Sequence, residues 1–245
     1  LGEGEAFDVS YDNIQKRLNS GVFLKIPIEY GFIKKDNRGK TVTLSFTIRN
    51  GNLDQLMNKG KLAGYTASML NKGTKNNSRQ ELDDKLSALK SSIGFRGSNG
   101  RVTANINTTE ENLMACLALM TDMLKNPKFD EAELEKLKTQ ELAGIEQNKT
   151  EPQFLVQKRL GELNQKYKKG HPLYSMSIEE DIEAIKAVTT KSIQAYYNDF
   201  YGISDNATLV VIGNFDEKLI RDYFETNFSN FKNNKPYTAV ANKFQ

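Results

Sequence analysis

The chain has 245 residues, 38% hydrophobic and 27% charged, which is typical of an ordinary globular protein with one large or two small domains. Its 34 Lys and Arg residues are interleaved with 31 Asp and Glu residues, and the formal net charge is only +3. Because no basic stripe results, nucleic acid is excluded as an expected partner.

The chain contains no apolar stretch long enough to span a bilayer, so no membrane-spanning segment is expected. Its first ten residues are acidic and lack the basic start and apolar core of a signal peptide.

The single cysteine, Cys116, shares a predicted helical face with Leu113, Leu117 and Met120, which indicates a small buried side chain rather than a reactive thiol. Without an internal disulfide, a periplasmic or cell-envelope location, which we suspect for a bacterial protein, and a cytoplasmic one are both open.

The first part of the chain alternates predicted strands with turns. Residues 21–28 form an apolar, strand-like run, and residues 36–40 supply turn residues. In residues 42–49 every second side chain is apolar, which predicts a half-buried strand. A helix is predicted next, over residues 54–72.

The second half of that helix belongs to the stretch 61–74, KLAGYTASMLNKGT, which is amphipathic. Its apolar face consists of Leu62, Tyr65, Met69 and Leu70. Gly64, Ala67 and Ser68 lie among these residues. Their side chains are small, at positions where one would expect a bulky or a chemically functional side chain. Gly73 can end the helix because glycine adopts left-handed backbone conformations at little cost.

A capping box, Ser78 with Glu81, predicts the start of the next helix, which is expected to end at Gly94. The glycine-rich stretch 94–101 follows a helix and precedes a strand. A phosphate-binding loop would follow a strand and open a helix, so a turn is the favoured interpretation. Residues 102–107 form the predicted strand.

Three helices are predicted in the middle of the chain. Thr108 is expected to cap the first, which Pro127 stops. Asp130 begins a long helix that reaches about Lys149, and Pro152 begins the third. The side chains of the third helix that are predicted to face inward are Val156, Leu160, Leu163 and Tyr167.

The C-terminal part is predicted to contain two short helices, capped by Ser177 and Thr189, and a final helix over residues 216–231. Between them, residues 207–213 are continuously apolar, which indicates a buried central strand. The whole pattern predicts an α+β fold in which a mainly antiparallel sheet of five or six strands packs with several helices. We divide the chain into an N-terminal segment (1–20), a single α+β domain (21–231) and a linker toward a following domain (232–245).

The single histidine limits the chemistry that the chain can perform. Most hydrolytic zinc sites need two or three imidazoles, and no nucleophile motif surrounds His171 in the loop GHPLY. His171 is therefore predicted to be structural or merely exposed, with a catalytic base as the alternative.

Six stretches of the sequence follow one another in an order that, taken together, indicates a protein family. They are LSFTIRNGN, KLAGYTASMLNKGT, TTEENL, GHPLY, VTTKSIQAYYNDFY and ATLVVIGNFDEKLIRDYFETNF. This series, covering about residues 42–232, resembles one repeat of the pitrilysin/insulinase family of zinc metallopeptidases. The resemblance implies the metallohydrolase fold of the mitochondrial-processing-peptidase type.

Catalytic repeats of that family carry the motif H-x-x-E-H on the helix that ends in Gly-Thr; two histidines hold zinc and the glutamate activates water. By this resemblance the motif positions fall on Gly64, Ala67 and Ser68, none of which can ligate zinc or act as the base. The downstream glutamate ligand falls on or near Gly144. Glutamates close to that position are Glu141 and Glu146. No catalytic, cofactor-binding or metal-binding residue is assigned, and this domain alone is predicted to be inactive.

The resemblance implies a noncatalytic domain or half of a zinc-dependent metalloendopeptidase. Its expected partners are a half that carries H-x-x-E-H, in the same chain or in a partner subunit, and peptide substrates. Zinc is expected in that catalytic half and not here. The domain would help to close a chamber around unfolded peptides, or would only support its neighbours. The alternative class is a stand-alone inactive homologue that acts as a binding or assembly subunit, and independent catalysis is a distant third.

Overall fold

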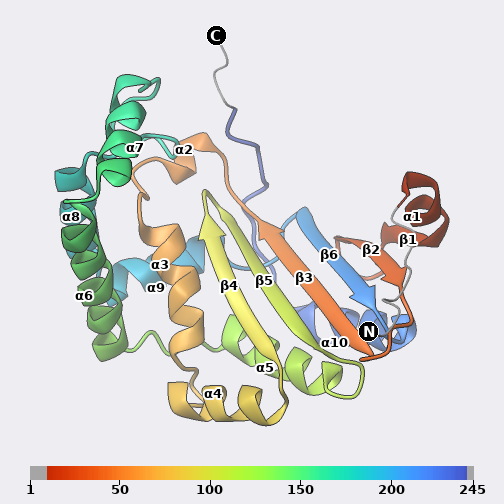
Figure 1. Ribbon diagram of the computed structural model, residues 1–245. Helices are drawn as coiled ribbons and strands as arrows, with labels where there is room; N and C mark the ends of the chain where they lie inside the picture. Colours follow the sequence, from red (N-terminus) through yellow and green to blue (C-terminus); the bar gives the residue numbers. More distant parts are fainter. Residues whose placement is uncertain (1–9, 242–245) are drawn as a thin grey trace, which may run out of the picture.

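A six-stranded sheet, in the order β1-β2-β6-β3-β5-β4, organises the computed structural model, which describes residues 10–241 (Figure 1). The strands are β1 (Leu18–Val22), β2 (Ile28–Lys34), β3 (Thr41–Arg49), β4 (Ser92–Ser98), β5 (Arg101–Thr109) and β6 (Asn206–Gly213). The pair β2–β6 is parallel, and every other neighbouring pair is antiparallel. The predicted α+β fold with a mainly antiparallel sheet is confirmed.

Helices precede and follow these strands. They are α1 (Tyr11–Arg17), α2 (Leu53–Leu56), α3 (Leu62–Met69) with the 3-10 turn η1 (Leu70–Lys72), α4 (Arg79–Ala88), α5 (Leu113–Lys125), α6 (Glu131–Asn148), α7 (Pro152–Leu163), α8 (Ile178–Lys186), α9 (Thr190–Phe200) and α10 (Glu217–Phe228). Capping boxes at Ser78, Ser177 and Thr189 begin α4, α8 and α9 as predicted, and the Asp130 carboxylate caps α6.

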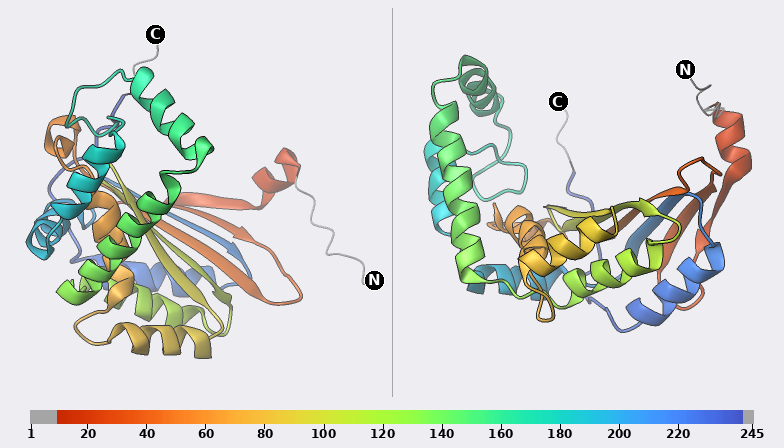
Figure 2. Two further views of the ribbon diagram at one scale, coloured as in Figure 1. Left: turned by 60° about the vertical axis from the view of Figure 1, so that its left-hand side comes forward. Right: turned by 60° about the horizontal axis from the view of Figure 1, so that its bottom comes forward.

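The helices cover one face of the sheet and leave the other face open. Helices α4, α5 and α10 lie against the covered face, and α6, α7 and α8 stand together beyond the β4 edge (Figure 2). On the covered face Phe46 of β3 packs edge-on against Phe224 and Phe228 of α10, at centroid distances of 5.1 and 5.2 Å. On the open face hydroxyl side chains pair across strands, as Thr47 and Thr103 do at 2.9 Å.

The predicted helix over residues 54–72 is two helices. Asn58 and Gly60 have positive φ angles of 60° and 39°, which a continuous right-handed helix does not allow. The chain therefore turns between α2 and α3. The amphipathic face of the second helix is confirmed for Tyr65 and Met69, which are buried, while Leu62 is half-buried.

The predicted turn over residues 94–101 is wrong. Most of it is strand β4, and the turn is confined to Asn99 and Gly100, whose φ angles of 45° and 74° suit a tight hairpin between β4 and β5. The expected helix cap at Thr108 is also wrong, because Thr108 pairs with Val42 inside β5. The glycines of β4 misled the prediction, since a glycine in a strand can mark the close approach of another segment.

Two predicted strands need correction. The run 21–28 spans the end of β1, an irregular segment and the first residue of β2, which pair as a hairpin rather than forming one strand. The run 207–213 lies in the central strand β6, but Val210 and Ile212 are 42% and 40% exposed. The strand is continuously apolar although only one of its faces is covered.

The largest disagreement concerns helix α7, which begins at Pro152 as predicted but has no buried residue. Val156, Leu160 and Leu163, expected to face inward, are 57%, 52% and 67% exposed. They do form one stripe, since they lie at steps of four and three residues. Within residues 10–241, nothing covers this stripe enough to bury any of its members.

The proposed division of the chain stays a prediction. Residues 1–9 and 242–245, which belong to the predicted N-terminal segment and linker, lie outside the described residues. The remainder of the first segment holds α1 and the start of β1. Residues 232–238 of the proposed linker run beside the domain, where Thr238 N–H donates to the Gly51 carbonyl at 3.0 Å and Gly51 N–H donates to the Lys235 carbonyl at 3.1 Å.

Candidate functional site

Helix α3, which carries the three motif positions, lies directly on the edge strand β4. A Cβ atom added to Gly97 of β4 would stand 2.1 Å from the Ala63 carbonyl oxygen and 2.9 Å from the Ala67 Cβ. Ala67 is 1% exposed, so the position where the family's catalytic base would lie is filled by this contact. Small residues on both elements therefore allow the backbones to approach closely.

The other two motif positions are more open. Gly64 is exposed, and a Cβ added there would meet only the Gly97 carbonyl oxygen, at 3.9 Å. Ser68 is half-buried. Gly144 on α6, the position of the expected distal glutamate, has nothing within 4 Å of an added Cβ. These positions keep space where the family's ligands would be, but they carry no ligand side chains.

The residues present do not fit a zinc ion. A hydrogen atom at Gly64 and a methyl group at Ala67 offer no donor atom, and the hydroxyl group of Ser68 cannot replace an imidazole ligand. Among residues 10–241 no group of three or more His, Cys, Asp and Glu side chains is placed to hold a metal ion. No catalytic step can be assigned to a metal in this domain.

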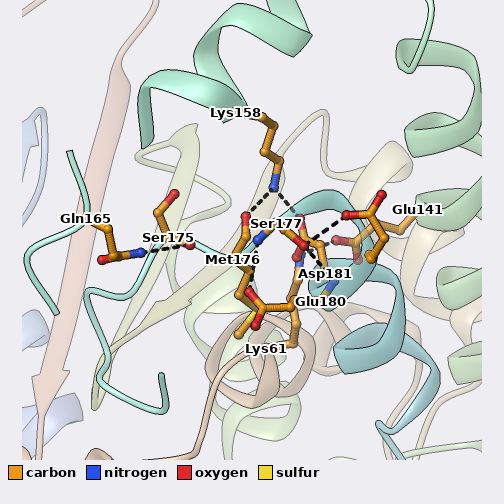
Figure 3. Close-up of polar contacts among 10 residues, drawn as sticks. Lys61, Glu141, Lys158, Gln165, Ser175, Met176, Ser177, Glu180 and Asp181 are labelled. Atoms are coloured by element: carbon orange, nitrogen blue, oxygen red, sulfur yellow. Dashed lines mark hydrogen bonds and ion pairs between the residues drawn. The ribbon is translucent and has the colours of Figure 1, made fainter. Parts of the chain in front are cut away.

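A network of four charged side chains lies one helical turn from Gly64 and joins four helices (Figure 3). The Lys61 ammonium at the start of α3 binds Glu141 of α6 and Asp181 of α8, both at 2.8 Å. Lys158 of α7 binds the second Asp181 oxygen at 2.7 Å and approaches the Met176 carbonyl at 3.5 Å. Two cations thus neutralise two carboxylates, so the network holds helices together without leaving an unpaired carboxylate.

Burial and charge act against each other in this network. Burial alone would raise the pKa of Asp181, but hydrogen bonds from Lys158 and Lys61 outweigh it and hold that pKa below its ordinary value of 3.8. Burial would lower the pKa of Lys61, and the carboxylates of Asp181 and Glu141 raise it instead. Tyr65, one turn along α3, has its pKa raised by burial and then by Glu141. Asp181 and Lys61 are therefore both charged near neutral pH.

Of the two glutamates near the expected distal ligand position, Glu141 binds Lys61 of α3, whereas Glu146 pairs with Lys149 on its own helix at 2.6 Å. No local pattern in the sequence predicts the other members of the network. Lys61 and Asp181 are far apart in the chain, and each lies in a helical turn with ordinary polar composition. Only the packing of α3, α6, α7 and α8 brings them together.

Cys116 is buried, as predicted, and His171 lies in the loop between α7 and α8. The His171 ring stacks on Tyr167 at a centroid distance of 4.2 Å, and its Nδ1 accepts the Leu173 N–H at 3.0 Å. Cys116 is fully buried on the inner face of α5, and its thiol donates to Thr108 Oγ1 at 3.4 Å.

The Gly-Thr pair that ends this helical segment is held by α5. Gly73 has a φ of 120°, which favours glycine, and the Thr74 hydroxyl donates to Asp122 of α5 at 2.6 Å. Burial would raise the pKa of Asp122, but the hydrogen bonds from Thr74, Asn126 and neighbouring asparagines lower it. The exit of the motif helix is therefore anchored even though the motif itself is missing.

The six-stranded sheet and the helix that ends in Gly-Thr characterise this domain, and no group of side chains within residues 10–241 forms a metal site. A family model described as insulinase (peptidase family M16) matches residues 32–176, and a model described as the peptidase M16 inactive domain matches residues 187–245. The chain belongs to the insulinase family, peptidase family M16. No curated protein gives a significant sequence match.

Solved structures share this fold at low sequence identity. A peptidase M16 inactive domain from Pseudomonas fluorescens is 17% identical, with a TM-score of 0.75 over 91% of this chain and 53% of that chain. A protease from Helicobacter pylori is 18% identical, with a TM-score of 0.69 over 93% of this chain and 53% of that one. The periplasmic protease PqqL from Escherichia coli is 15% identical, with a TM-score of 0.69 over 92% of this chain and 25% of that one.

The chain thus spans about half the length of the first two of these structures and a quarter of the third. The family resemblance that the six stretches indicated is confirmed. The chain is an M16 inactive domain of a peptidase-like protein. Among the described residues, no helix has both the length and the apolar character needed to cross a membrane.

Proposed function

We propose that this domain is the noncatalytic part of a zinc-dependent M16 metalloendopeptidase and that its open sheet face forms part of the wall of a substrate chamber. The observation that carries the proposal is the one-sided sheet. Val210 and Ile212 of the central strand are 42% and 40% exposed, whereas Leu209 and Val211 beside them are fully buried. An extended apolar and hydroxyl-rich surface of this kind suits contact with unfolded peptides of varied sequence.

The empty motif supports the noncatalytic part of the proposal. Gly64, Ala67 and Ser68 cannot hold zinc, so peptide cleavage would need a second half that carries H-x-x-E-H and its zinc ion. That half would lie in the same chain or in a partner subunit. We expect the purified 245-residue chain to contain no stoichiometric zinc and to cleave no unfolded peptide. One zinc per chain, lost when His171 is replaced, would contradict this.

The chamber role is tested by adding the domain to a purified half that carries the motif and measuring cleavage of a fluorogenic peptide. The domain should raise the cleavage rate. The double variant Val210→Asp/Ile212→Asp should bind the catalytic half as well as the wild type does but raise KM for the peptide. If the catalytic half alone is equally active, the chamber role is wrong.

Helix α7 favours a second candidate, a binding or assembly subunit. Its exposed apolar stripe of Val156, Leu160 and Leu163 is the kind of surface that partner proteins cover. A triple replacement of these residues by glutamine distinguishes the two roles. It should abolish complex formation if α7 is the assembly surface, and it should leave the complex intact if the sheet face alone carries the function.

A further inference from the structure

A cavity of about 440 Å³ is bordered by Lys61 of the charged network, and none of the three motif positions lines it. The turn between α2 and α3, the loop over residues 169–176 and helix α8 form its walls. Lys61, Met176 and Glu180, which Figure 3 labels, border it. Its volume is within the range of small-molecule sites in proteins.

Part of the lining of this cavity is apolar. Its apolar lining includes Leu62 of α3, Met176, Ala184 of α8 and Val188, which lies two residues after the end of α8. Val188 is only 3% exposed, and its side chain belongs to the hydrophobic core. An apolar group of a ligand would therefore lose contact with water here without displacing a charged side chain.

Two hydrogen-bond donors at the cavity have no partner within residues 10–241. The half-buried Lys59 makes no ion pair or side-chain hydrogen bond. His171 accepts the Leu173 N–H at Nδ1, so its Nε2 bears the N–H, which has no acceptor among the described residues. By contrast, Lys169 is neutralised by Glu180 at 2.8 Å.

The rim that carries these donors is held in one conformation. The Asn58 N–H donates to the Gly170 carbonyl at 2.7 Å and joins the α2–α3 turn to the loop of His171. A Cβ added to Gly170, whose φ is 91°, would stand 2.2 Å from the Asn58 side-chain oxygen. Stacking on Tyr167 also fixes the His171 ring. A ligand would find the site formed, which reduces the entropic cost of binding.

We propose that this cavity binds a ligand with a single carboxylate joined to an apolar group, the chemistry found at the C-terminal residue of a peptide or in a small apolar acid. Lys59 and His171 receive the carboxylate, and the apolar surface around Leu62 and Val188 receives the side chain. Glu180 and the exposed Glu183 border the same cavity and disfavour a ligand with a second negative charge, such as a phosphate ester. This inference does not rest on the chamber role, because it concerns binding by this chain alone.

The test measures binding of a fluorescein-labelled peptide ending in leucine to the 245-residue chain by fluorescence anisotropy. The free acid should bind, and the C-terminal amide should bind about tenfold or more weakly because a charge-assisted hydrogen bond is lost. Unlabelled N-acetyl-leucine and octanoate are then added as competitors. Stronger competition by N-acetyl-leucine assigns the site to peptide ends, and stronger competition by octanoate assigns it to aliphatic acids.

Two variants and one control make the assignment specific. Lys59→Met should weaken binding of the free acid about tenfold, and Ala184→Phe should abolish it by filling the apolar part. Lys191→Met removes the same charge from an exposed position outside the cavity and should leave binding unchanged. Equal binding of acid and amide, or wild-type affinity in a folded Lys59→Met variant, would overturn the proposal.

Discussion

Helices α3 and α7 show similar apolar periodicity in the sequence but have opposite environments in the structure. Helix α3 lies between strand β4 and helix α9, and Tyr65, Ala67 and Met69 are at most 3% exposed. Helix α7 buries none of its residues. Periodicity shows that a helix has an apolar face, but it does not show what covers that face. For α3 the cover lies in the same domain, whereas no described residue buries a side chain of α7.

The largest effect is expected at the contact between α3 and β4. Gly97→Ala places a methyl group 2.1 Å from the Ala63 carbonyl oxygen, so the helix must move away from the strand. We expect a loss of about 3 kcal/mol in the free energy of unfolding, measured by urea denaturation. Gly94→Ala on the same strand is the control, because nothing lies within 4 Å of its added Cβ. Equal losses in the two variants would show that the close contact is not responsible.

The next effect concerns the charged network that ties α7 and α8 to α3. Lys61→Met leaves Glu141 and Asp181 without their shared cation, and we expect a loss of about 1–2 kcal/mol, since the groups are only partly exposed. Lys218→Met removes a lysine from an exposed ion pair with Asp222 and should not change the stability measurably. If both variants unfold at the same urea concentration, the network contributes no more than a surface pair.

Measuring the free energy of unfolding at several pH values tests the contribution of the Asp181 carboxylate to the same network. The pKa of Asp181 in the folded chain is below its ordinary value of 3.8, so the charged form stabilises the fold above that pH. This contribution is lost as the pH falls through the lowered pKa. The stability difference between the wild type and Asp181→Asn should therefore be largest near neutral pH and shrink below pH 3.8. A difference that stays constant across the series would show that charge plays no part.

The smallest effect is expected on helix α7. Leu160 is 52% exposed, so Leu160→Gln should change the free energy of unfolding by no more than about 0.5 kcal/mol. Leu70 in η1 is fully buried, and Leu70→Gln should be strongly destabilising. If the two variants lose similar stability, α7 is covered within the domain and the contrast between the helices does not hold.

Local signals predicted much of the secondary structure. The capping boxes at Ser78, Ser177 and Thr189 begin helices where expected, because a cap is a contact between residues three apart in the chain. The alternation in residues 42–49 predicted the buried face of β3 for the same kind of local reason. The glycines of 94–101 were misread because the demand for Gly97 comes from helix α3, which is distant in the chain.

The order of residues was enough to identify the family and to predict that Gly64, Ala67 and Ser68 stand where its zinc ligands and base would lie, because both inferences compare residues along the chain. The tertiary structure alone decided that Lys61 meets Glu141 and Asp181, that Lys59 and His171 border one cavity, and that α7 is exposed. These features need helices from separate parts of the chain to be placed side by side. Such placement follows from the packing of the whole domain around its sheet, which no local pattern specifies.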